Sequence, residues 1–370
     1  MHTRTNEIRS FLQHADDSLA IRRTLDTALD TGDMDLISEA IALSRTYREN
    51  KEHFYEKAAT YLQKLEKTDS PEHAAPQLLL TASNIGKTYV SGGFTLRPIS
   101  LQVYAGSIIG VVGQNGHGKT TLLRCIAGQL AHDSGELVFE KISQPDYYSI
   151  KQQVAFIPQR IPRWRGGLKD NLHFSAALSG IEAEENEVMV NFMLERLSLA
   201  NFAHLSWDQV SSGYRTRFEI ARILLQRPDL LILDEPLANL DINAQQTILT
   251  DLRYMAKSLR HPMGILLSSQ QLHEVEKVAD TVILIRDGEC MFNTGTLNPM
   301  PSLFVLEIET TAGRDRISEV LGDAELHFNG GFFTISSVSM TVQEMIRKLA
   351  VAEIPLTYTR DISRSTKRFF

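Results

Sequence analysis

The stretch that decides the fold is Gly113–Thr121, which reads GQNGHGKTT. It follows the apolar run Ile108–Val112, and the amphipathic run Leu122–Ile126 comes after it. A glycine-rich turn between a strand and a helix lets backbone amides and a helix N-terminus converge on a triphosphate. The sequence therefore predicts a phosphate-binding loop, and this context disfavours the alternative of a glycine-rich turn that binds nothing.

The residues of this loop have separate expected roles. Lys119 is expected to neutralise the β- and γ-phosphates of ATP, and the hydroxyl of Thr120 to bind Mg²⁺. The other nucleotide contacts are expected from Gly113, Asn115, Gly116, Gly118 and Thr121. His117 is interpreted as a variable loop residue and not as a catalyst, because the backbone around it does the binding.

A second apolar run, Leu230–Leu233, ends in the carboxylates of Asp234 and Glu235. Parallel strands buried on both faces read as continuous apolar runs, and sheets of this kind bind ligands at their C-terminal edge. Asp234 is expected to hold Mg²⁺, directly or through water, and Glu235 to be the base that polarises the attacking water. A strand that merely ends in charged turn residues is common in isolation, but the upstream phosphate loop disfavours that reading.

Composition bounds the class of protein. A chain of 370 residues predicts two or three units, and 43% apolar with 22% charged residues excludes disorder and fibrous repeats. The net charge of −7 argues against a nucleic-acid partner. No apolar run approaches the roughly 20 residues of a membrane-spanning helix, and Met1–Ser10 lacks the apolar stretch of a secretory signal. Cys125 and Cys290 lack metal-ligand or redox spacing, so a reducing cytosol is expected.

The first region of the chain, 1–70, is expected to be a helical unit. Its apolar residues recur at intervals of three and four, with Gly32 as a helix stop and Asp33 as the cap of the next helix. Its apolar stripe is either a small core or a partner-docking surface. The segment 71–77 contains two prolines and is expected to be a linker.

The rest of the chain is expected to form two more units. In residues 78–296, short β-rich runs alternate with helical patterns, which predicts an α/β fold with a largely parallel sheet. Residues 302–370 are expected to form a small α+β unit of ferredoxin-like order. Its predicted elements are a strand at Leu303–Glu309, a helix at Arg314–Leu321, two strands around the turn Asn329–Gly331, a helix at Val342–Ala352 and a strand at Pro355–Arg360.

With the loop and the acidic strand in hand, residues 78–296 resemble the nucleotide-binding domain of the ATP-binding-cassette (ABC) family. The resemblance implies an ABC-type P-loop NTPase fold with a helical subdomain at 160–227. It also implies that Tyr89 stacks on adenine and that Gln159 reaches Mg²⁺ and the attacking water. Asn239–Asp241 matches the loop that crosses to the other protomer, so Asp241 is expected at the nucleotide.

The family signature, usually LSGGQ, is altered here to Val210–Tyr214, VSSGY. The resemblance implies that Ser211 and the amides around Gly213 clasp the γ-phosphate bound to the opposite subunit. Ser212 is tolerable in place of glycine where φ is negative. Tyr214 lacks the amide of the usual glutamine, which places the contacts at this edge in doubt.

A second departure falls in Ser268–Gln270, where the family normally has Ser-Ser-His. Gln270 can donate a neutral hydrogen bond to the γ-phosphate but cannot become cationic. Charged hydrogen bonds are stronger by about 1 kcal/mol, and about 1.4 kcal/mol is tenfold in rate. ATP hydrolysis is therefore expected to be slowed and not abolished.

The family resemblance also implies partners. A single cassette cannot complete its own site, so a homodimer that sandwiches two ATP molecules is expected. The favoured function is the ATP-hydrolysing subunit of a bacterial exporter with separate multi-spanning membrane subunits, located in the cytoplasm and peripheral on the inner face of the membrane. The alternative is a soluble, non-transport ATPase that moves a macromolecular partner.

Two segments favour the exporter function. The first is Leu168–Leu172, which resembles the segment that receives a coupling helix, with Trp164 and Arg165 as candidate contacts; an exposed loop with one packed aromatic ring is an equal alternative. The second is the C-terminal unit, which resembles the small domain appended to ATPases of drug, lipid or polysaccharide-type exporters. Its closing segment, Asp361–Phe370, is a loose match to the end of that domain.

Overall fold

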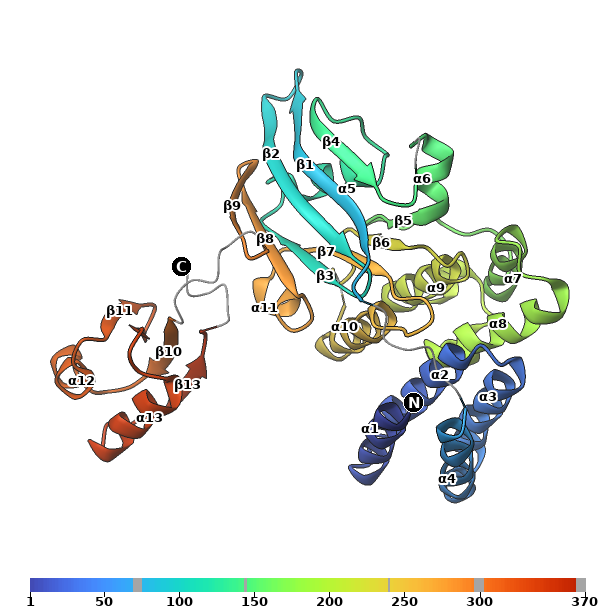
Figure 1. Cartoon of the computed structure of the whole chain (residues 1–370), viewed down its shortest axis with the longest axis horizontal. Coiled ribbons are helices and arrows are strands. Elements are labelled where there is room, and N and C mark those ends of the chain that lie inside the picture. Colours follow the sequence, from blue (N-terminus) through green and yellow to red (C-terminus); the bar gives the residue numbers. More distant parts are fainter. Residues whose placement is uncertain (69–74, 143–144, 239, 296–302, 364–370) are drawn as a thin grey trace. The chain divides into compact units, whose positions relative to one another are not determined.

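The chain begins with a bundle of helices. The computed structural model describes residues 1–68, 75–142, 145–238, 240–295 and 303–363, and Figure 1 shows its elements along the chain. The first helices are α1 (His2–Gln13), α2 (Asp17–Thr31), α3 (Met34–Glu49) and α4 (Lys51–Glu66). The helical prediction for this region is confirmed, whereas residues 71–74 of the predicted linker lie outside the described residues.

Local signals set the ends of these helices. The side chains of Asp16, Asp33 and Asn50 accept hydrogen bonds from backbone N–H groups in the first turns of α2, α3 and α4. Helix α2 ends at Gly32, whose φ of 70° is left-handed, a conformation that glycine adopts without a steric penalty. The predicted stop at Gly32 and cap at Asp33 are both confirmed.

The central sheet has the strand order β5-β6-β7-β3-β8-β9. Its strands are β3 (Ile108–Val112), β5 (Val154–Ile157), β6 (Leu230–Leu233), β7 (Gly264–Ser269), β8 (Thr281–Arg286) and β9 (Glu289–Asn293). The first five in that order pair in parallel. Strands β3 and β6 are buried at every position. Because parallel strands end at the same edge, the segments after β3, β5, β6 and β7 meet there.

A second sheet and two helices flank the central sheet. The antiparallel sheet β2-β1-β4 is made of β1 (Leu78–Tyr89), β2 (Phe94–Tyr104) and β4 (Ser134–Phe139). Helix α5 (Lys119–Ile126) buries Leu122 and Ile126 in one cluster with Leu80 and Ile99 of that sheet. Helix α6 (Tyr147–Gln153) precedes β5.

A helical insertion separates β5 from β6. It contains the helices α7 (Leu168–Leu178), α8 (Ala183–Arg196) and α9 (Ser212–Leu224), with the 3-10 turns η1 (Ala200–Phe202) and η2 (Trp207–Gln209). These elements fall inside the span 160–227 expected for a helical subdomain. Helices α10 (Ile242–Ala256) and α11 (Leu272–Val275) follow β6 and β7.

The N-terminal helices share a hydrophobic core with this insertion. Leu25 of α2 and Ile37 of α3 belong to the same buried cluster as Phe192 of α8 and Leu252 of α10. Helices α2 and α3 pack against α8, and α2 also packs against α10. The chain divides into two compact units, Met1–Phe292 and Asn293–Phe370. The predicted boundary between residues 1–70 and the ATPase domain stays a prediction.

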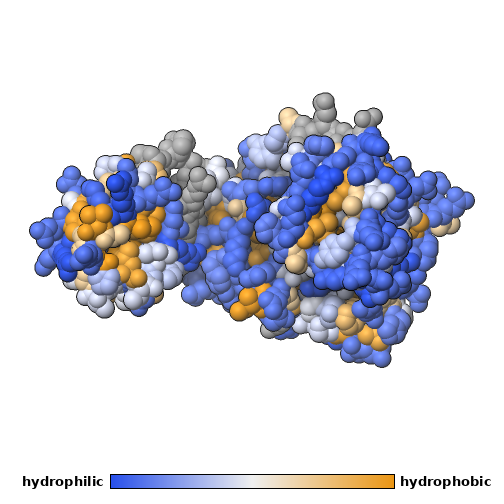
Figure 2. Space-filling view, turned by 90° about the horizontal axis from the view of Figure 1, so that it is seen from below, coloured by the Kyte–Doolittle hydropathy of each residue, from blue (hydrophilic) through white to orange (hydrophobic). Residues whose placement is uncertain are grey.

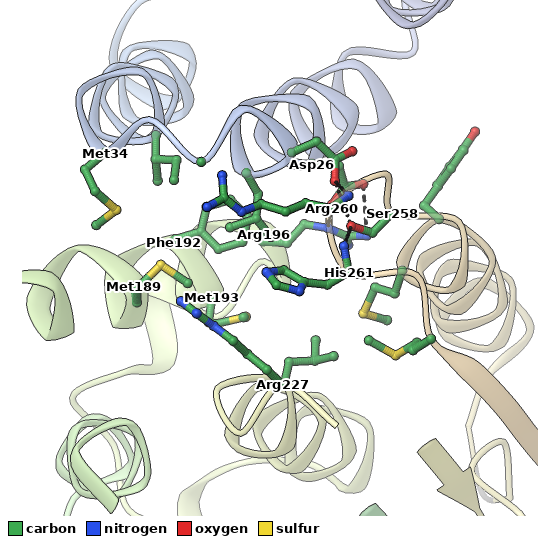
Figure 3. Close-up of a pocket in the computed structure, with 18 of the residues that line it drawn as sticks. Asp26, Met34, Met189, Phe192, Met193, Arg196, Arg227, Ser258, Arg260 and His261 are labelled. Carbon is green, nitrogen blue, oxygen red and sulfur yellow. Dashed lines mark hydrogen bonds and ion pairs between the residues drawn. The ribbon is translucent and has the colours of Figure 1, made fainter. Parts of the chain in front are cut away.

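A cavity of about 210 Å³ lies inside the first unit. Figure 3 shows that its labelled lining residues come from the N-terminal helices, from α8, from the segment after α10 and, for Arg227, from the segment between α9 and β6. Met34 belongs to the first group, Phe192 to the second and His261 to the third. Neither the helical periodicity nor the family resemblance predicted this cavity.

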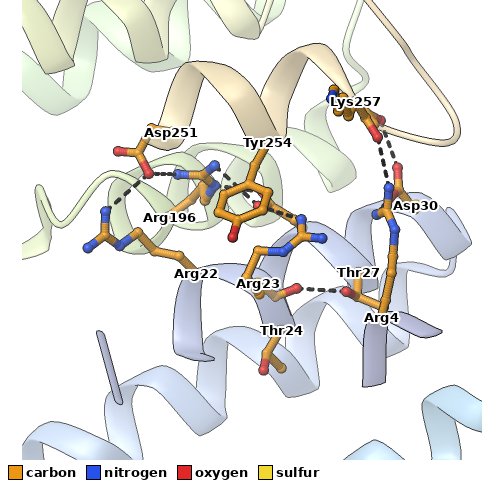
Figure 4. Close-up of polar contacts among 12 residues, drawn as sticks. Arg4, Arg22, Arg23, Thr24, Thr27, Asp30, Arg196, Asp251, Tyr254 and Lys257 are labelled. Atoms are coloured by element: carbon orange, nitrogen blue, oxygen red, sulfur yellow. Dashed lines mark hydrogen bonds and ion pairs between the residues drawn. The ribbon is translucent and has the colours of Figure 1, made fainter. Parts of the chain in front are cut away.

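An ion network buried beside the cavity joins the N-terminal helices, α8 and α10 (Figure 4). Arg196 at the end of α8 places Nε 2.6 Å from Oδ1 of Asp26 and Nη1 2.7 Å from Oδ1 of Asp251. Arg22 also reaches Asp251, at 3.1 Å. Burial alone would lower the pKa of Arg196, but the two carboxylates raise it. One guanidinium therefore ties α8 both to α2 and to α10.

The neighbouring Glu195 ties α8 to α3. Its carboxylate accepts hydrogen bonds from Ser44 Oγ at 2.9 Å and from Arg48 Nη1 and Nη2 at 2.6 and 2.7 Å. Burial raises the pKa of Glu195, but the hydrogen bonds from Arg48 and Ser44 outweigh it and hold this pKa below its usual 4.5. The carboxylate is therefore charged in the folded chain at neutral pH.

The C-terminal unit has the ferredoxin-like order predicted from the sequence. Its elements are β10 (Phe304–Glu309), α12 (Arg314–Leu321), β11 (Glu325–Asn329), β12 (Phe332–Ser337), α13 (Val342–Val351) and β13 (Tyr358–Asp361). The strands form an antiparallel sheet in the order β11-β12-β10-β13. Leu306, Ile335 and Met345 belong to a buried cluster of their own. Residues 364–370 of the closing segment lie outside the described residues.

Figure 2 shows a largely hydrophilic face with apolar side chains in separate patches. Large apolar side chains with more than half of their area exposed include Phe174 and Leu178 on α7 and Tyr148 on α6. In the described part of the chain, no helix has the length and apolar content needed to cross a membrane.

Candidate active site

The loop between β3 and α5 depends on glycines in the left-handed region. Gly116 has φ 83° and Gly118 has φ 105°. A Cβ atom on Gly118 would also lie 2.9 Å from Cζ of Phe94. Helix α5 begins at the next residue, Lys119. The loop therefore leads directly into a helix N-terminus, where unpaired backbone N–H groups favour an anion.

Lys119 is buried within this loop. Its ammonium group donates to the carbonyl oxygens of Gly113 at 2.8 Å and Gln114 at 3.1 Å. It also lies 3.0 Å from Oε1 of Glu235, and the residue is only 4% exposed. A compact positive charge is thus held at the mouth of the loop, beside the acidic end of β6.

Asp234 links the loop to two strands. One carboxylate oxygen accepts a hydrogen bond from Thr120 Oγ1, the other accepts one from Ser268 Oγ, and both distances are 2.8 Å. Ser268 Oγ in turn accepts from the backbone N–H of Glu235 at 2.8 Å. No role for Ser268 was predicted from the sequence, because only the sheet order places β7 between β3 and β6.

The oxygen atoms around Asp234 fit Mg²⁺. This ion prefers oxygen ligands and usually uses one or two carboxylates together with substrate phosphates and water. Thr120 and Asp234 supply a hydroxyl and a carboxylate side by side. No group of three or more His, Cys, Asp or Glu side chains in the described residues could hold a metal by itself, so a bound phosphate would have to complete the coordination.

Three side chains converge on the carboxylate of Glu235. Lys119 lies beside Oε1, while the amide nitrogens of Gln159 and Gln270 both donate to Oε2 at 2.8 Å. Glu235 is 8% exposed, and its φ of 49° is a strained value for a residue other than glycine. Residues that follow three other strands, β3, β5 and β7, therefore fix this carboxylate in one orientation.

Two aromatic residues lie beside the phosphate loop: Tyr89, which was predicted from the sequence, and Phe94, which was not. Tyr89 ends β1 and is half-buried, with its ring centroid 6.3 Å from that of Phe94. Phe94 is the ring that approaches Gly118. Tyr89 therefore lies next to Phe94, which in turn approaches the phosphate loop. Its predicted contact with adenine stays a prediction.

The altered signature lies at the start of α9. Ser211 is the N-cap residue of this helix. In the described residues, neither Ser211 nor Gly213 has a hydrogen bond or ion pair with the phosphate loop. The ring of Tyr214 packs on Phe202 with centroids 3.9 Å apart. Tyr214 is thus part of the packing of the insertion, which accounts for an aromatic residue at this position.

Asp241 has a local role in addition to its predicted one. Its side chain caps α10 by accepting a hydrogen bond from the N–H of Ala244 at 2.9 Å. Asn239, the first residue of the predicted crossing loop, lies outside the described residues. Leu240 lies close to Gly213, since a Cβ atom on that glycine would be 3.2 Å from Leu240 Cδ2. The signature and the crossing loop are therefore neighbours within one chain.

The two candidate contacts for a membrane subunit differ in burial. Trp164 stacks on Trp207 with centroids 5.1 Å apart, and its indole N–H donates to Glu219 at 3.1 Å. Arg165 is exposed beside a surface hollow that both tryptophans line. Trp164 therefore forms the floor of the hollow, and Arg165 is the side chain free to reach a partner.

Two reactive residue types near the loop lack the features of a catalyst. Burial raises the pKa of the Cys125 thiol to about 11, so this thiol is not a nucleophile near neutral pH. The Nε2 atom of His117 lies 3.6 Å from Oδ1 of Asp287. Neither residue joins the group around Glu235.

These contacts determine what the site can do. Backbone amides and the ammonium group of Lys119 can hold a polyphosphate. The carboxylate of Glu235, fixed next to them, can act on a water molecule. The fold and the site thus define a phosphate-loop nucleotide hydrolase.

Comparison with known proteins identifies the family. The family model for ABC transporters matches residues 96–238. The chain is 30% identical over 231 residues to the phosphonates import ATP-binding protein PhnC of Treponema denticola, covering 58% of this chain and 89% of the relative. It is 33% identical over 232 residues to PhnC of Bdellovibrio bacteriovorus, covering 58% and 87%. The chain belongs to the ABC transporter family and is an ATP-binding subunit with ATPase activity.

Solved structures support the fold. The chain is similar to cbiO1 from Clostridium perfringens, part of the ABC transporter complex cbiONQ, with a TM-score of 0.53 and 24% identity over 59% of this chain and 88% of that one. A putative metal-chelate type ABC transporter gives a TM-score of 0.51 at 21% identity, covering 70% of this chain and 97% of that one. The predicted ABC-type P-loop fold is therefore confirmed.

Proposed function

We propose that this ATPase powers a bacterial ABC exporter whose membrane-spanning subunits are separate chains, and that it acts from the cytoplasmic face of the membrane. The observation that carries the enzymatic part is the convergence of Lys119, Gln159 and Gln270 on Glu235. The ferredoxin-like C-terminal unit supports the direction of transport, because it resembles the domain appended to ATPases of exporters.

The proposed reaction begins with capture of the nucleotide. The amides of the loop and Lys119 bind the β- and γ-phosphates, and Tyr89 stacks on the adenine ring. Thr120, Asp234 and Gln159 would hold Mg²⁺, which would neutralise charge on the phosphates. Asp234 is already oriented for this role by its hydrogen bond from Ser268.

Hydrolysis in this proposal depends on Glu235. Its carboxylate accepts a proton from the attacking water. Gln159 and Gln270 orient the carboxylate by donating hydrogen bonds to Oε2. Gln270 donates a neutral hydrogen bond where an imidazolium would donate a charged one, so charge on the γ-phosphate is less stabilised. Turnover is slowed for this reason. The variant Gln270→His should raise steady-state hydrolysis, and an unchanged or lower rate would contradict this role.

The proposed dimer follows from the position of the signature. Ser211 is the N-cap residue of α9, and a helix N-terminus favours an anion, yet this residue has no bond to its own phosphate loop in the described part of the chain. In a symmetric pair, Ser211, Gly213 and Asp241 of one subunit complete the site of the other. ATP binding therefore closes the dimer, and hydrolysis releases it.

The dimer can be tested with Glu235→Gln, which keeps the hydrogen-bonding shape of the side chain but removes the base. Size-exclusion chromatography with saturating MgATP should show a dimer for this variant and a monomer without nucleotide. Glu325→Gln, an exposed change on β11, is the matched control and should behave like wild type. A Glu235→Gln protein that stays monomeric in MgATP would overturn the dimer.

Import is the second candidate for the direction of transport. The PhnC relatives are named for phosphonate import, which favours an importer as the second candidate. Purification of the tagged chain from native membranes should recover a multi-spanning protein, and Arg165→Glu should reduce this recovery. Vesicles that contain the recovered complex then give the direction. ATP-driven movement away from the ATPase side supports export, movement toward it supports import, and recovery of ribosomes or DNA alone would favour the non-transport alternative.

A further inference from the structure

The cavity of the first unit has an apolar wall. Leu29, Ile37, Phe192 and Leu224 contribute to it. The wall also contains five methionines: Met34, Met189, Met193, Met255 and Met263. Methionine side chains are flexible and polarisable and adapt to irregular apolar ligands. Met189 and Met193 come from α8, whereas Met255 and Met263 come from the ATPase core. The wall is therefore suited to an apolar body and not to a sugar or a base, whose polar groups would need partners.

The carboxylates near the cavity are already paired. Asp26 is bound by Arg196. Asp30 forms an ion pair with Arg4 and accepts hydrogen bonds from Ser258 Oγ at 2.7 Å and from the N–H of Arg260 at 3.2 Å. These acidic groups are thus unavailable to a metal ion.

The rim of the cavity is positively charged. It carries the guanidinium groups of Arg227 and Arg260 and the imidazole of His261, and one exposed carboxylate, that of Glu185. Within the described ranges, neither arginine forms an ion pair with a carboxylate; Arg260 donates to the carbonyl oxygen of Thr31 at 3.1 Å. Burial, with Arg227 and Arg260 beside it, lowers the pKa of His261. Positive charge therefore exceeds negative charge at the rim.

Arg227 has an uncommon backbone conformation. Its φ of 51° is left-handed, and Pro228 follows it. This conformation is uncommon for a long side chain, and glycine adopts it more easily. The packing of the backbone does not require an arginine here, so the guanidinium is available for another role.

We propose that this cavity binds a monocarboxylate with an unbranched apolar chain of about seven carbons, with its carboxylate between Arg227 and Arg260. An apolar cavity of roughly 150 Å³ accommodates benzene, which has six carbons, so the volume of about 210 Å³ has room for a somewhat longer apolar chain. A planar guanidinium can donate two parallel hydrogen bonds to a carboxylate. The lining comes from the N-terminal helices, α8 and the ATPase core, so a bound ligand would contact all three.

The test is calorimetric titration of the full chain, without nucleotide, with octanoate as the probe. Octanoate should bind saturably. Octan-1-ol should bind at least about tenfold more weakly because it lacks the charge, and butyrate at least about tenfold more weakly because it lacks most of the apolar chain. Arg227→Gly should weaken octanoate binding about tenfold while its thermal midpoint stays equal or rises, because glycine suits the left-handed backbone. Arg347→Gln, an exposed change on α13, is the control and should bind as wild type does.

Any of the following results would overturn the proposal. One is the absence of saturable octanoate binding. Another is equal affinity for octanoate and octan-1-ol, which would show that the charged rim has no role. The last is an Arg227→Gly protein that binds octanoate as wild type does, or one that loses stability together with affinity, because the guanidinium would then be structural.

Discussion

The two regions that flank the nucleotide-binding domain are built in different ways. The N-terminal helices contribute to the same buried cluster as α8 and α10, and Arg196 and Glu195 add charged contacts to the shared core. The C-terminal region has a buried cluster of its own and forms a separate compact unit. Two regions of similar size in the sequence therefore differ in kind: one is part of the ATPase core and the other is an independent unit.

The largest expected effect comes from breaking the ion network of the N-terminal helices. Arg196→Met leaves Asp26 and Asp251 buried with their main cation removed, which should cost about 3–5 kcal/mol in the free energy of unfolding. Urea denaturation measures this loss. Arg347→Met on α13 should change stability by less than about 0.5 kcal/mol. An Arg196→Met protein within about 1 kcal/mol of wild type would show that this ion network adds little to the docking of the N-terminal helices.

The next prediction separates the two regions directly. Leu65→Ala in α4 and Met345→Ala in α13 each remove a fully buried side chain, at a cost of about 2–5 kcal/mol. Scanning calorimetry should show that Leu65→Ala shifts the transition of the ATPase core, whereas Met345→Ala shifts a separate transition and leaves ATP hydrolysis unchanged. A single transition moved equally by both variants would contradict the division into two units.

The smallest predicted effect concerns pH. The pKa of Glu195 is lowered in the folded chain, so its stabilising contribution is fully present above its usual value of 4.5 and is lost as the pH falls toward the folded pKa. Glu195→Gln should therefore cost about 1–2 kcal/mol at pH 7 and progressively less below pH 4.5. Urea unfolding of both proteins between pH 3 and 7 measures this. A difference that stays constant over this range would show that the charge of Glu195 is not involved.

Much of the fold could be predicted because its signals are local. Gly32 and Asp33 mark a helix end and a helix start, and the turn around Gly330 separates two strands, as the sequence indicated. The phosphate loop and the acidic end of β6 are also continuous segments. The site was therefore found wherever its chemistry lies within a few consecutive residues.

The remaining features depend on packing between distant segments. Ser268 orients Asp234 only because β7 lies between β3 and β6 in the sheet. Phe94 is adjacent to Gly118 through the fold of the second sheet. The cavity combines side chains from three regions, and Arg196 looks like an ordinary polar residue at the end of a helix. No spacing in the sequence encodes such neighbours, so periodicity could not reveal them.

The most direct measurement is calorimetric titration of the purified chain with MgATP, comparing wild type with Lys119→Ala. Lys119 supplies the one buried ammonium group of the phosphate loop. We expect saturable binding by wild type and an affinity at least about tenfold lower for Lys119→Ala, which corresponds to about 1.4 kcal/mol or more. A wild-type chain that shows no affinity for MgATP, or a Lys119→Ala variant that binds it equally well, would contradict the account of the site.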